Sequence, residues 1–210
     1  TRGLKRFGLE NITPILPERL SNGYGLTSEI VEEANKNDIS LIITVDNGIS
    51  TLPASYRAKE LGIDLIITDH HTPFETLPEA VSIINPKLES PDHPSANLCG
   101  AGVAFKLSFA LNGTPNDLDL VAIATIADVM PLTGENRTLV ALGLQHLAKY
   151  KRLGIRALAE MASIELDQID VEKISYTIAP RINAAGRLDN ASKSLELILK
   201  DETLNLSNEQ

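Results

Sequence analysis

The spacing of hydrophobic residues changes near Pro94 and divides the sequence into two parts of different character. Before Pro94, short and continuous apolar runs stand at 41–45, 65–68 and 81–84, and polar or small residues follow each of them. Such runs predict strands that are buried on both faces, as in a parallel sheet. The segment 52–61 between the first two runs is long enough for a crossover helix, so the pattern predicts βαβ architecture.

Helical spacing dominates the rest of the chain. Residues 1–9 are predicted to be the last turns of a helix with Gly8 as its C-cap, and 27–35 a helix that begins at a hydroxyl cap. A short strand is predicted at 12–16. After Pro94 the spacing predicts helices at 101–111, 118–127, 139–150, 155–162, 170–178 and about 190–200. The predicted fold class is α/β: an open, mainly parallel sheet flanked by helices, followed by a helical segment.

Composition narrows the class of protein. The chain has 210 residues, of which 43% are hydrophobic, and this is enough for one sizeable core. Its apolar runs are far shorter than the ~20 residues that span a bilayer, and no secretion signal opens the sequence. The single cysteine, Cys99, forms no internal disulfide, which is typical of a reducing compartment. We therefore expect a cytoplasmic protein that has no membrane partner.

The charge of the chain bears on how it would bind nucleic acid. The net charge is −9, from 28 acidic and 19 basic residues. Proteins that coat nucleic acid without sequence preference are usually basic, so this balance argues against that class. It does not argue against a nuclease, because metal ions and a few arginines can supply positive charge locally.

Two short polar segments follow the first two predicted strands. Asp-Asn-Gly stands at 46–48 and Asp-His-His at 69–71. Ligands of open α/β sheets bind beyond the carboxyl ends of the strands, so these side chains are expected at one edge. Carboxylate and imidazole groups together predict a site for a divalent metal. Alone, Asp46 could equally be a turn residue and the histidines ordinary surface residues, but the repetition after two similar strands favours a metal site.

Two further segments carry candidate residues with weaker signals. Asp128 ends a predicted apolar helix, where a carboxylate faces the negative pole, so it is either a functional residue or a surface acid before a proline. Gly100 and Gly102 open a predicted helix, whose N–H groups could bind a phosphate or could simply belong to a turn.

A segment rich in small residues carries Arg181, Asn183 and Arg187. Guanidinium groups and accessible backbone amides suit phosphate, because the planar arginine fork donates two parallel hydrogen bonds. A linker with solvated arginines explains the same residues equally well. Taken alone, this segment therefore leaves both interpretations open.

Taken together, the motifs resemble the DHH phosphoesterase superfamily. Asp-His-His at 69–71 is similar to the signature of the superfamily. The segments 45–48, 127–132 and 180–187 resemble the RecJ branch in their order and rough spacing, and 100–105 also favours that branch over pyrophosphatases and small nucleotide phosphatases. The resemblance covers nearly the whole chain.

The resemblance implies a phosphodiesterase with two Mn²⁺ or Mg²⁺ ions that removes nucleotides from the 5′ end of single-stranded DNA in repair and recombination. It implies that Asp46 bridges the two ions, and that His70 and Asp128 complete the shell of one. His71 would contact the scissile phosphate, and Asp69 would orient the histidines. The substrate phosphates would be held by residues carried over from the remaining motifs, namely Arg181, Arg187, Asn183, Gly100 and Gly102.

The resemblance also implies what lies around this sequence. In the family an Asp-x-Asp motif lies upstream of the first helix, and this sequence does not contain it. We therefore expect 1–189 to be a DHH phosphoesterase domain truncated at its N-terminus, and 190–210 to begin a connecting helix or second domain. Single-stranded DNA is the implied partner, and a single-strand-binding protein or a helicase would be further ones.

Two alternatives remain open. One is a small-substrate phosphoesterase of the same superfamily, acting on short oligonucleotides or a nucleoside bisphosphate. The other is a non-catalytic fragment that binds metal or a partner protein, which the lack of the upstream motif would fit. The presence of Asp46, His70, His71 and Asp128 in one sequence favours an active enzyme.

Overall fold

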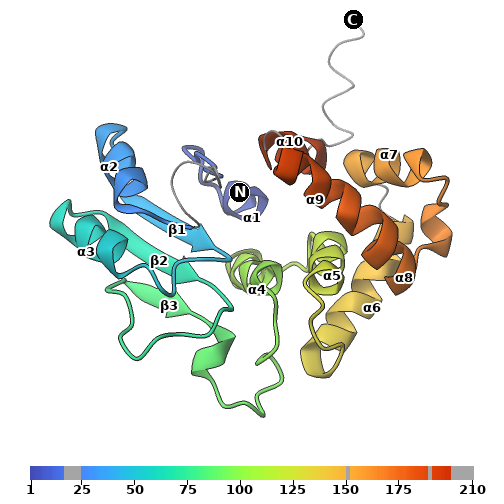
Figure 1. The fold of residues 1–210 in the computed structure, drawn as a ribbon, viewed down its shortest axis with the longest axis horizontal. Coiled ribbons are helices and arrows are strands. Elements are labelled where there is room, and N and C mark those ends of the chain that lie inside the picture. The colour runs from blue at the N-terminus through green and yellow to red at the C-terminus, as the bar shows by residue number, and fades with distance from the viewer. Residues whose placement is uncertain (17–24, 150–151, 189–190, 200–210) are drawn as a thin grey trace, which may run out of the picture. The chain divides into compact units, whose positions relative to one another are not determined.

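The computed structural model describes two compact units (Figure 1). The described residues are 1–16, 25–149, 152–188 and 191–199. The units comprise Thr1–Asn116 with Thr133–Asn136, and Asp117–Leu132 with Arg137–Gln210. The domain boundary expected at 189/190 concerns the arrangement of the whole protein and stays a prediction.

The first unit is built on a parallel sheet in which β2 lies between β1 and β3 (Figure 1). In the register, Val45 pairs with Thr68 and Thr68 with Ile84, so the strands end at one edge of the sheet. The predicted α/β class with a parallel sheet is therefore confirmed. All the strands of this sheet were predicted by the apolar runs, and they are β1 (Leu41–Val45), β2 (Asp64–Thr68) and β3 (Ser82–Ile84).

Helices α2 and α3 cover the sheet on one side and contribute most of its core. They bury Leu65 and Ile67 of the central strand together with Val31, Ala54 and Ala58 of their own. The first turn of α4 lies at the carboxyl ends of β1 and β2 (Figure 1). The α-helices described in this unit are α1 (Arg2–Arg6), α2 (Ser28–Lys36), α3 (Leu52–Glu60) and α4 (Gly100–Asn112), and a 3₁₀ turn follows β3 at Pro86–Leu88.

The N-terminal segment agrees with the sequence in part. Helix α1 ends as predicted, because Gly8 has a φ of 101° and the N–H groups of Gly8 and Leu9 donate to carbonyls of the last helical turn. This is the Schellman arrangement, in which glycine takes the left-handed conformation. The strand predicted at 12–16 is wrong, since these residues form no strand. Pro14 lies in the middle of the segment and lacks the amide hydrogen that a strand needs for pairing.

The second unit is helical around one apolar core. Its largest fully buried side chains include Ile155, Ile174 and Ile178, which pack with Ile123 and Ile126. The predicted helices are present. The helix at 118–127 has the predicted ends, the longest begins earlier than expected, and the ends predicted at 150, 190 and 200 lie outside the described residues. The described helices are α5 (Leu118–Ala127), α6 (Gly134–Lys149, whose first turn groups with the first unit), α7 (Leu153–Met161), α8 (Val171–Lys173), α9 (Ala179–Leu188) and α10 (Ala191–Leu199).

The linker alternative for the arginine-containing segment is wrong, because 179–188 forms helix α9. A π-helical stretch, Ile174–Ile178, leads into this helix without a break. Pro180 has no amide hydrogen for an intrahelical bond, and the wider π turns come directly before it. We attribute the continuity of the helix through this proline to those turns. Arg181 and Arg187 therefore belong to a helix and not to a loop.

A buried ion pair joins the beginnings of α5 and α7. Nε of Arg152 lies 2.7 Å from a carboxylate oxygen of Asp119, and Nη2 lies 2.9 Å from Asp117. Burial lowers the pKa of Arg152, but the hydrogen bonds and charges of the two carboxylates outweigh burial and the net pKa is raised. The guanidinium therefore stays charged and holds two helix starts together.

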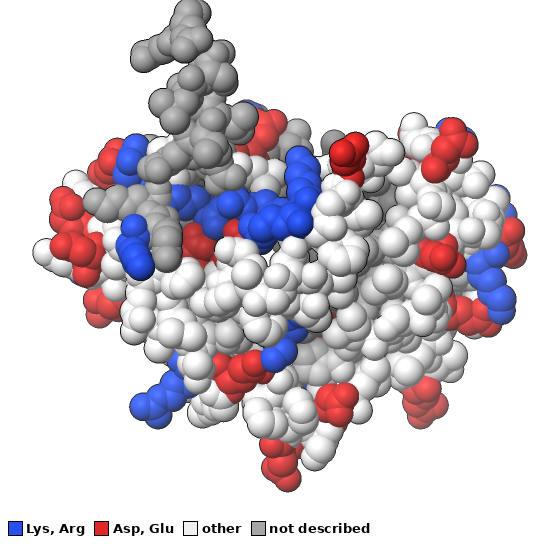
Figure 2. Space-filling view, turned by 180° about the vertical axis from the view of Figure 1, so that it is seen from behind, with Lys and Arg blue, Asp and Glu red and all other residues white. Residues whose placement is uncertain are grey.

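Two observations on the described residues bear on the environment expected for the protein. Among the described residues, no helix combines the length and the apolar character that a transmembrane span requires. On the face drawn in Figure 2, acidic side chains are scattered among uncharged ones. The excess of acidic residues therefore does not form one continuous acidic surface on this face.

Candidate metal centre

The turns after β1 and β2 leave the sheet side by side. The N–H of Asp46 donates to Thr68 O at 3.0 Å, and the N–H of Asp69 donates to Ile84 O at 3.1 Å, so pairing extends one residue past each strand. The Thr68 hydroxyl donates to Thr44 O at 2.6 Å and joins the two strands just before they end. These bonds place the predicted segments 46–48 and 69–71 at the same edge, as expected.

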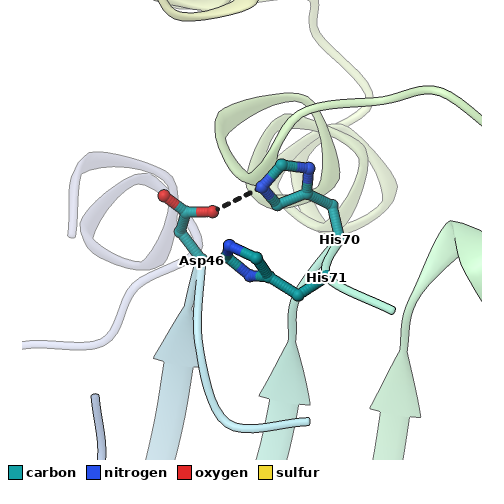
Figure 3. A group of neighbouring side chains, drawn as sticks. All are labelled: Asp46, His70 and His71. Atoms are coloured by element: carbon teal, nitrogen blue, oxygen red, sulfur yellow. Dashed lines mark ion pairs between the residues drawn. The ribbon is translucent and has the colours of Figure 1, made fainter. Parts of the chain in front are cut away.

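Asp46, His70 and His71 form a cluster at this edge (Figure 3). One ligand atom from each lies within 4.8 Å of the other two. Oδ1 of Asp46 lies 3.0 Å from Nε2 of His70, and the side chains point toward each other. Asp46 has a φ of 63°, a left-handed conformation that aspartate tolerates better than most residues. This turn of the backbone directs the carboxylate toward the histidines.

The cluster fits a divalent metal ion. Adjacent ligands of an octahedral ion at ~2.1 Å from the metal are about 3 Å apart, which agrees with the 3.0 Å between Asp46 and His70. A carboxylate with imidazoles suits Mn²⁺ and related ions. The Asp46 side chain is 50% exposed and that of His70 11%, so the group is partly open to solvent. His71, which the sequence assigned to the phosphate, is also close enough to serve as a ligand.

Asp69 lies beneath the cluster and orients it. Its side chain is 1% exposed. Oδ2 accepts the Ile49 N–H at 3.0 Å, while Oδ1 accepts the N–H groups of His70 and His71 at 2.7 and 3.2 Å and lies 2.7 Å from His71 Nδ1. Burial raises the pKa of Asp69, but these bonds outweigh burial and the net pKa lies below its ordinary value.

Because Asp69 is ionised, it can only accept hydrogen bonds. Nδ1 of His71 must therefore carry a hydrogen, which leaves Nε2 for a metal ion or a substrate oxygen. This geometry is what the predicted orienting role of Asp69 requires. The catalytic roles of both residues stay predictions.

Asn85 supports the same histidine, and the sequence analysis did not single it out. Its side chain is buried, Nδ2 donates to His71 O at 2.9 Å, and Oδ1 accepts the Lys87 N–H at 2.9 Å. The available signal was its position directly after the third strand, at the edge where the other polar residues stand. Polar residues follow all three parallel strands. The physical reason for which the segments 46–48 and 69–71 were predicted at this edge therefore applies to Asn85 as well.

A cleft of about 540 Å³ lies beside the cluster. Asp69 and His71 line it from one side, and the segment 47–51 and the first turns of α2 and α3 line the rest. Ligand sites in proteins commonly have volumes of ~300–1,000 Å³. The cleft is therefore large enough for a nucleotide-sized group next to His71.

The other predicted site residues of the first unit lie at the start of α4. Gly100 and Gly102 are both buried, and Cys99 caps the helix by accepting the Gly102 N–H on its sulfur at 3.4 Å. Gly100 lies directly against the Asp46 carboxylate. The phosphate contacts predicted for these two glycines stay a prediction.

Four predicted site residues belong to the second unit, which is described apart from the cluster. Asp128 is the exposed C-cap of α5. Arg181 and Asn183 are exposed on α9, and Nη1 of Arg181 donates to Thr177 O at 2.9 Å. Arg187 lies in the same helix, and its side chain is outside the described part. Since the two units are not placed relative to each other, the roles of these residues stay predictions.

Comparison with known proteins gives concordant results. A family model described as "DHH family, N-terminal domain" matches residues 1–127. The chain is similar to the single-stranded-DNA-specific exonuclease RecJ of Salmonella typhimurium, with 42% identity across 95% of this chain and 38% of the relative. It is also similar to a crystal structure of exonuclease RecJ bound to manganese, with 40% identity and a TM-score of 0.84 across 97% of this chain and 52% of that one.

A second solved structure, RecJ from Thermus thermophilus in complex with Mn²⁺, has 38% identity and a TM-score of 0.80. The match covers 97% of this chain and 30% of that chain. The chain thus spans less than two fifths of the curated relative and about a third to a half of the solved ones.

Proposed function

This chain belongs to the DHH family, and from that membership we propose that it is the metal-binding part of an exonuclease that degrades single-stranded DNA. The proposed reaction of the complete enzyme is hydrolysis of phosphodiester bonds from the 5′ end, with release of nucleotides, in DNA repair and recombination. Similarity to a RecJ exonuclease across 95% of the chain supports this proposal. A single-strand-binding protein or a helicase is the proposed partner besides DNA.

The observation that carries the proposal is the convergence of Asp46, His70 and His71 at the carboxyl edge of the sheet. The three side chains come from two separate turns, and the ligand atoms fit the spacing of one ion's shell. A nucleotide-sized cleft opens beside them. A metal centre next to such a cleft suits metal-dependent hydrolysis of a phosphodiester.

We propose that Mn²⁺ or Mg²⁺ binds here. Asp46 and His70 would hold one ion, Asp128 would complete its shell, and Asp46 would also contact a second ion in the complete enzyme. When bound, two divalent ions activate water and neutralise charge on the attacking and leaving oxygens.

The protein's own groups would orient the substrate. Asp69 fixes the ring of His71 through Nδ1, so Nε2 of His71 keeps a constant direction toward whatever it binds. Nε2 of His71 would contact an oxygen of the scissile phosphate. On α9, Arg181 and Arg187 would hold a neighbouring phosphate through their forked donors, with Asn183 between them.

The test is nucleotide release from a 5′-phosphorylated single strand in the presence of Mn²⁺. The complete enzyme is expected to release mononucleotides, and Asp46→Asn in it is expected to lower kcat/KM at least about 100-fold, since the ligand loses its charge. Asp64→Asn is the matched control, because Asp64 lies at the opposite end of β2 and is exposed. Retained activity in Asp46→Asn would show that the metal site is assigned wrongly.

Substrate length separates the proposal from its alternatives. An exonuclease should degrade a long single strand in preference to a dinucleotide or a nucleoside bisphosphate. The reverse preference would indicate a small-substrate phosphoesterase. Mn²⁺ binding without cleavage of any of these substrates would indicate a non-catalytic role for this chain.

A further inference from the structure

The first turn of α4 packs against the candidate metal ligand Asp46, and the contact is made by Gly100. We propose that Gly100 is a positioning residue for Asp46: the missing side chain lets α4 hold the carboxylate in the direction that faces His70. This inference rests on the proposed metal centre. It assigns to Gly100 a role in metal binding, separate from the phosphate contact predicted for it.

The space at Gly100 is already filled by Asp46. A Cβ atom at position 100 would lie 2.5 Å from both Cβ and Cγ of Asp46, and closer still to Oδ1. Carbon atoms in contact are normally ~3.5–4.0 Å apart. The three nearest atoms all belong to the one residue, so any larger side chain at position 100 acts first on Asp46.

Neither side of this contact can give way by rotating a side chain. A Cβ is fixed by its own backbone, and rotation about χ1 of Asp46 moves Cγ and Oδ1 but not the Cβ that is also too close. Relief therefore needs a backbone shift. The start of α4 is held by Cys99, which accepts the N–H groups of Gly102 and Val103. Asp46 is held by its N–H bond to Thr68 O.

The same close approach brings the N-terminus of α4, a helix of 13 residues, to the carboxylate of Asp46. The positive pole of a helix favours a nearby negative charge. A side chain at position 100 would hold the carboxylate away from this pole. Gly100 thus lets the carboxylate of Asp46 lie at the N-terminus of α4, in the direction that faces His70.

The first experiment measures Mn²⁺ affinity by isothermal titration calorimetry, without DNA. Gly100→Ala is expected to weaken binding about 10- to 100-fold, the usual range for residues that orient a metal ligand. Gly102→Ala is the matched control for metal affinity. A Cβ at position 102 would lie 3.1 Å from Leu98 Cδ2, a flexible side-chain end, and its three nearest atoms would all belong to Leu98. This variant is expected to bind Mn²⁺ as the wild type does.

The outcomes separate this inference from the proposed function. If the wild type binds no Mn²⁺, the metal centre itself is wrong. If the wild type binds and Gly100→Ala binds equally well, the metal centre stands and the positioning role is wrong.

A second experiment tests whether Gly100 acts through Asp46, by thermal unfolding in EDTA. Asp46→Gly removes the three atoms that would lie nearest to a Cβ at position 100, and glycine suits the φ of 63° at this position. Gly100→Ala is expected to lower the Tm in the wild-type background and not in the Asp46→Gly background. This rescue remains measurable even if Gly100→Ala alone fails to fold. An equal loss of Tm in both backgrounds would overturn the inference, because the added methyl would then act elsewhere.

Discussion

The backbone conformation of Val129 is predicted to lower the stability of the protein, because glycine would adopt the same conformation at a lower cost. It has a φ of 54°, and its side chain is 84% exposed. The N–H of Val129 donates to Ile126 O and that of Met130 to Thr125 O, both at 3.1 Å, so α5 ends in a Schellman motif with valine in the glycine position. A β-branched residue in the left-handed region is a genuine outlier.

The magnitude follows from two opposing contributions. The left-handed conformation costs a non-glycine residue roughly 1–2 kcal/mol. Replacing valine by glycine removes this cost but increases the entropy of the unfolded chain, which offsets about 0.5–1 kcal/mol. Little burial is lost, because the side chain is exposed. Val129→Gly is therefore expected to raise the free energy of unfolding by about 0.5–1 kcal/mol, or the Tm by roughly 1–4 °C for a chain of this size.

The assay is urea unfolding of the wild type, Val129→Gly and Val129→Ala, followed by circular dichroism. Val129→Ala keeps a Cβ and with it most of the left-handed cost, so it should stay close to the wild type. If Val129→Gly is no more stable than the wild type, the side chain makes a stabilising contact that outweighs the strain, and the reasoning fails.

Three other changes have outcomes that the structure defines. Arg152→Met leaves the buried carboxylate of Asp119 without its partner and should lower the free energy of unfolding by about 3–5 kcal/mol in urea titrations. Asn85→Ala removes the bond to His71 O and should cost about 1–2 kcal/mol and lower kcat. Burial raises the pKa of Glu135, but its lysine and serine partners outweigh burial and the net pKa is lowered. The ionised Glu135 therefore contributes fully to the stability of the fold above about pH 4.3, and this contribution is lost as the pH falls through the lowered pKa. Glu135→Gln should be less stable than the wild type at pH 6, by less than about 1 kcal/mol, and nearly equal to it at pH 3.

Each of these changes has a control on a similar residue. Arg156→Met removes an exposed i,i+4 pair and should change stability by less than about 0.5 kcal/mol. Asn116→Ala removes an exposed amide far from any strand end and should leave kcat unchanged. Lys36→Met, at an exposed helix end, should not alter the pH dependence. A loss in any control as large as in its paired variant would contradict the corresponding explanation.

The sheet and the metal cluster could be predicted from the sequence for one physical reason. Continuous apolar runs mark strands of a parallel sheet, and parallel strands place the residues that follow them at one edge. Asp46 and 69–71 could thus be brought together without any knowledge of three-dimensional contacts. The same logic would have found Asn85, which stands one position after the third run.

Other features depend on contacts that spacing does not reveal. The strand at 12–16 was predicted from apolar residues, although Pro14 prevents the pairing. The helix at 179–188 was obscured by proline and glycine, whose cost is offset by π turns and by the core around Ile178. The contact between Gly100 and Asp46 joins positions 54 residues apart and depends on the absence of one carbon atom, so no local pattern could indicate it.

A strained backbone conformation occurs at Asp46 and directly after Asp128, the two carboxylates that are proposed to bind metal. Asp46 itself has a positive φ, and Val129 with a positive φ follows Asp128 directly. For Asp46 the cost is small, because aspartate tolerates this conformation, and the strand pairing around it defines the turn. For Val129 no burial offsets the cost, and a glycine would relieve it. Backbone strain that the surrounding structure maintains clusters at functional sites, and here the hydrogen bonds of Val129 and Met130 maintain it. The conformation at Val129 therefore argues for a functional role of the segment that carries Asp128, independently of any motif.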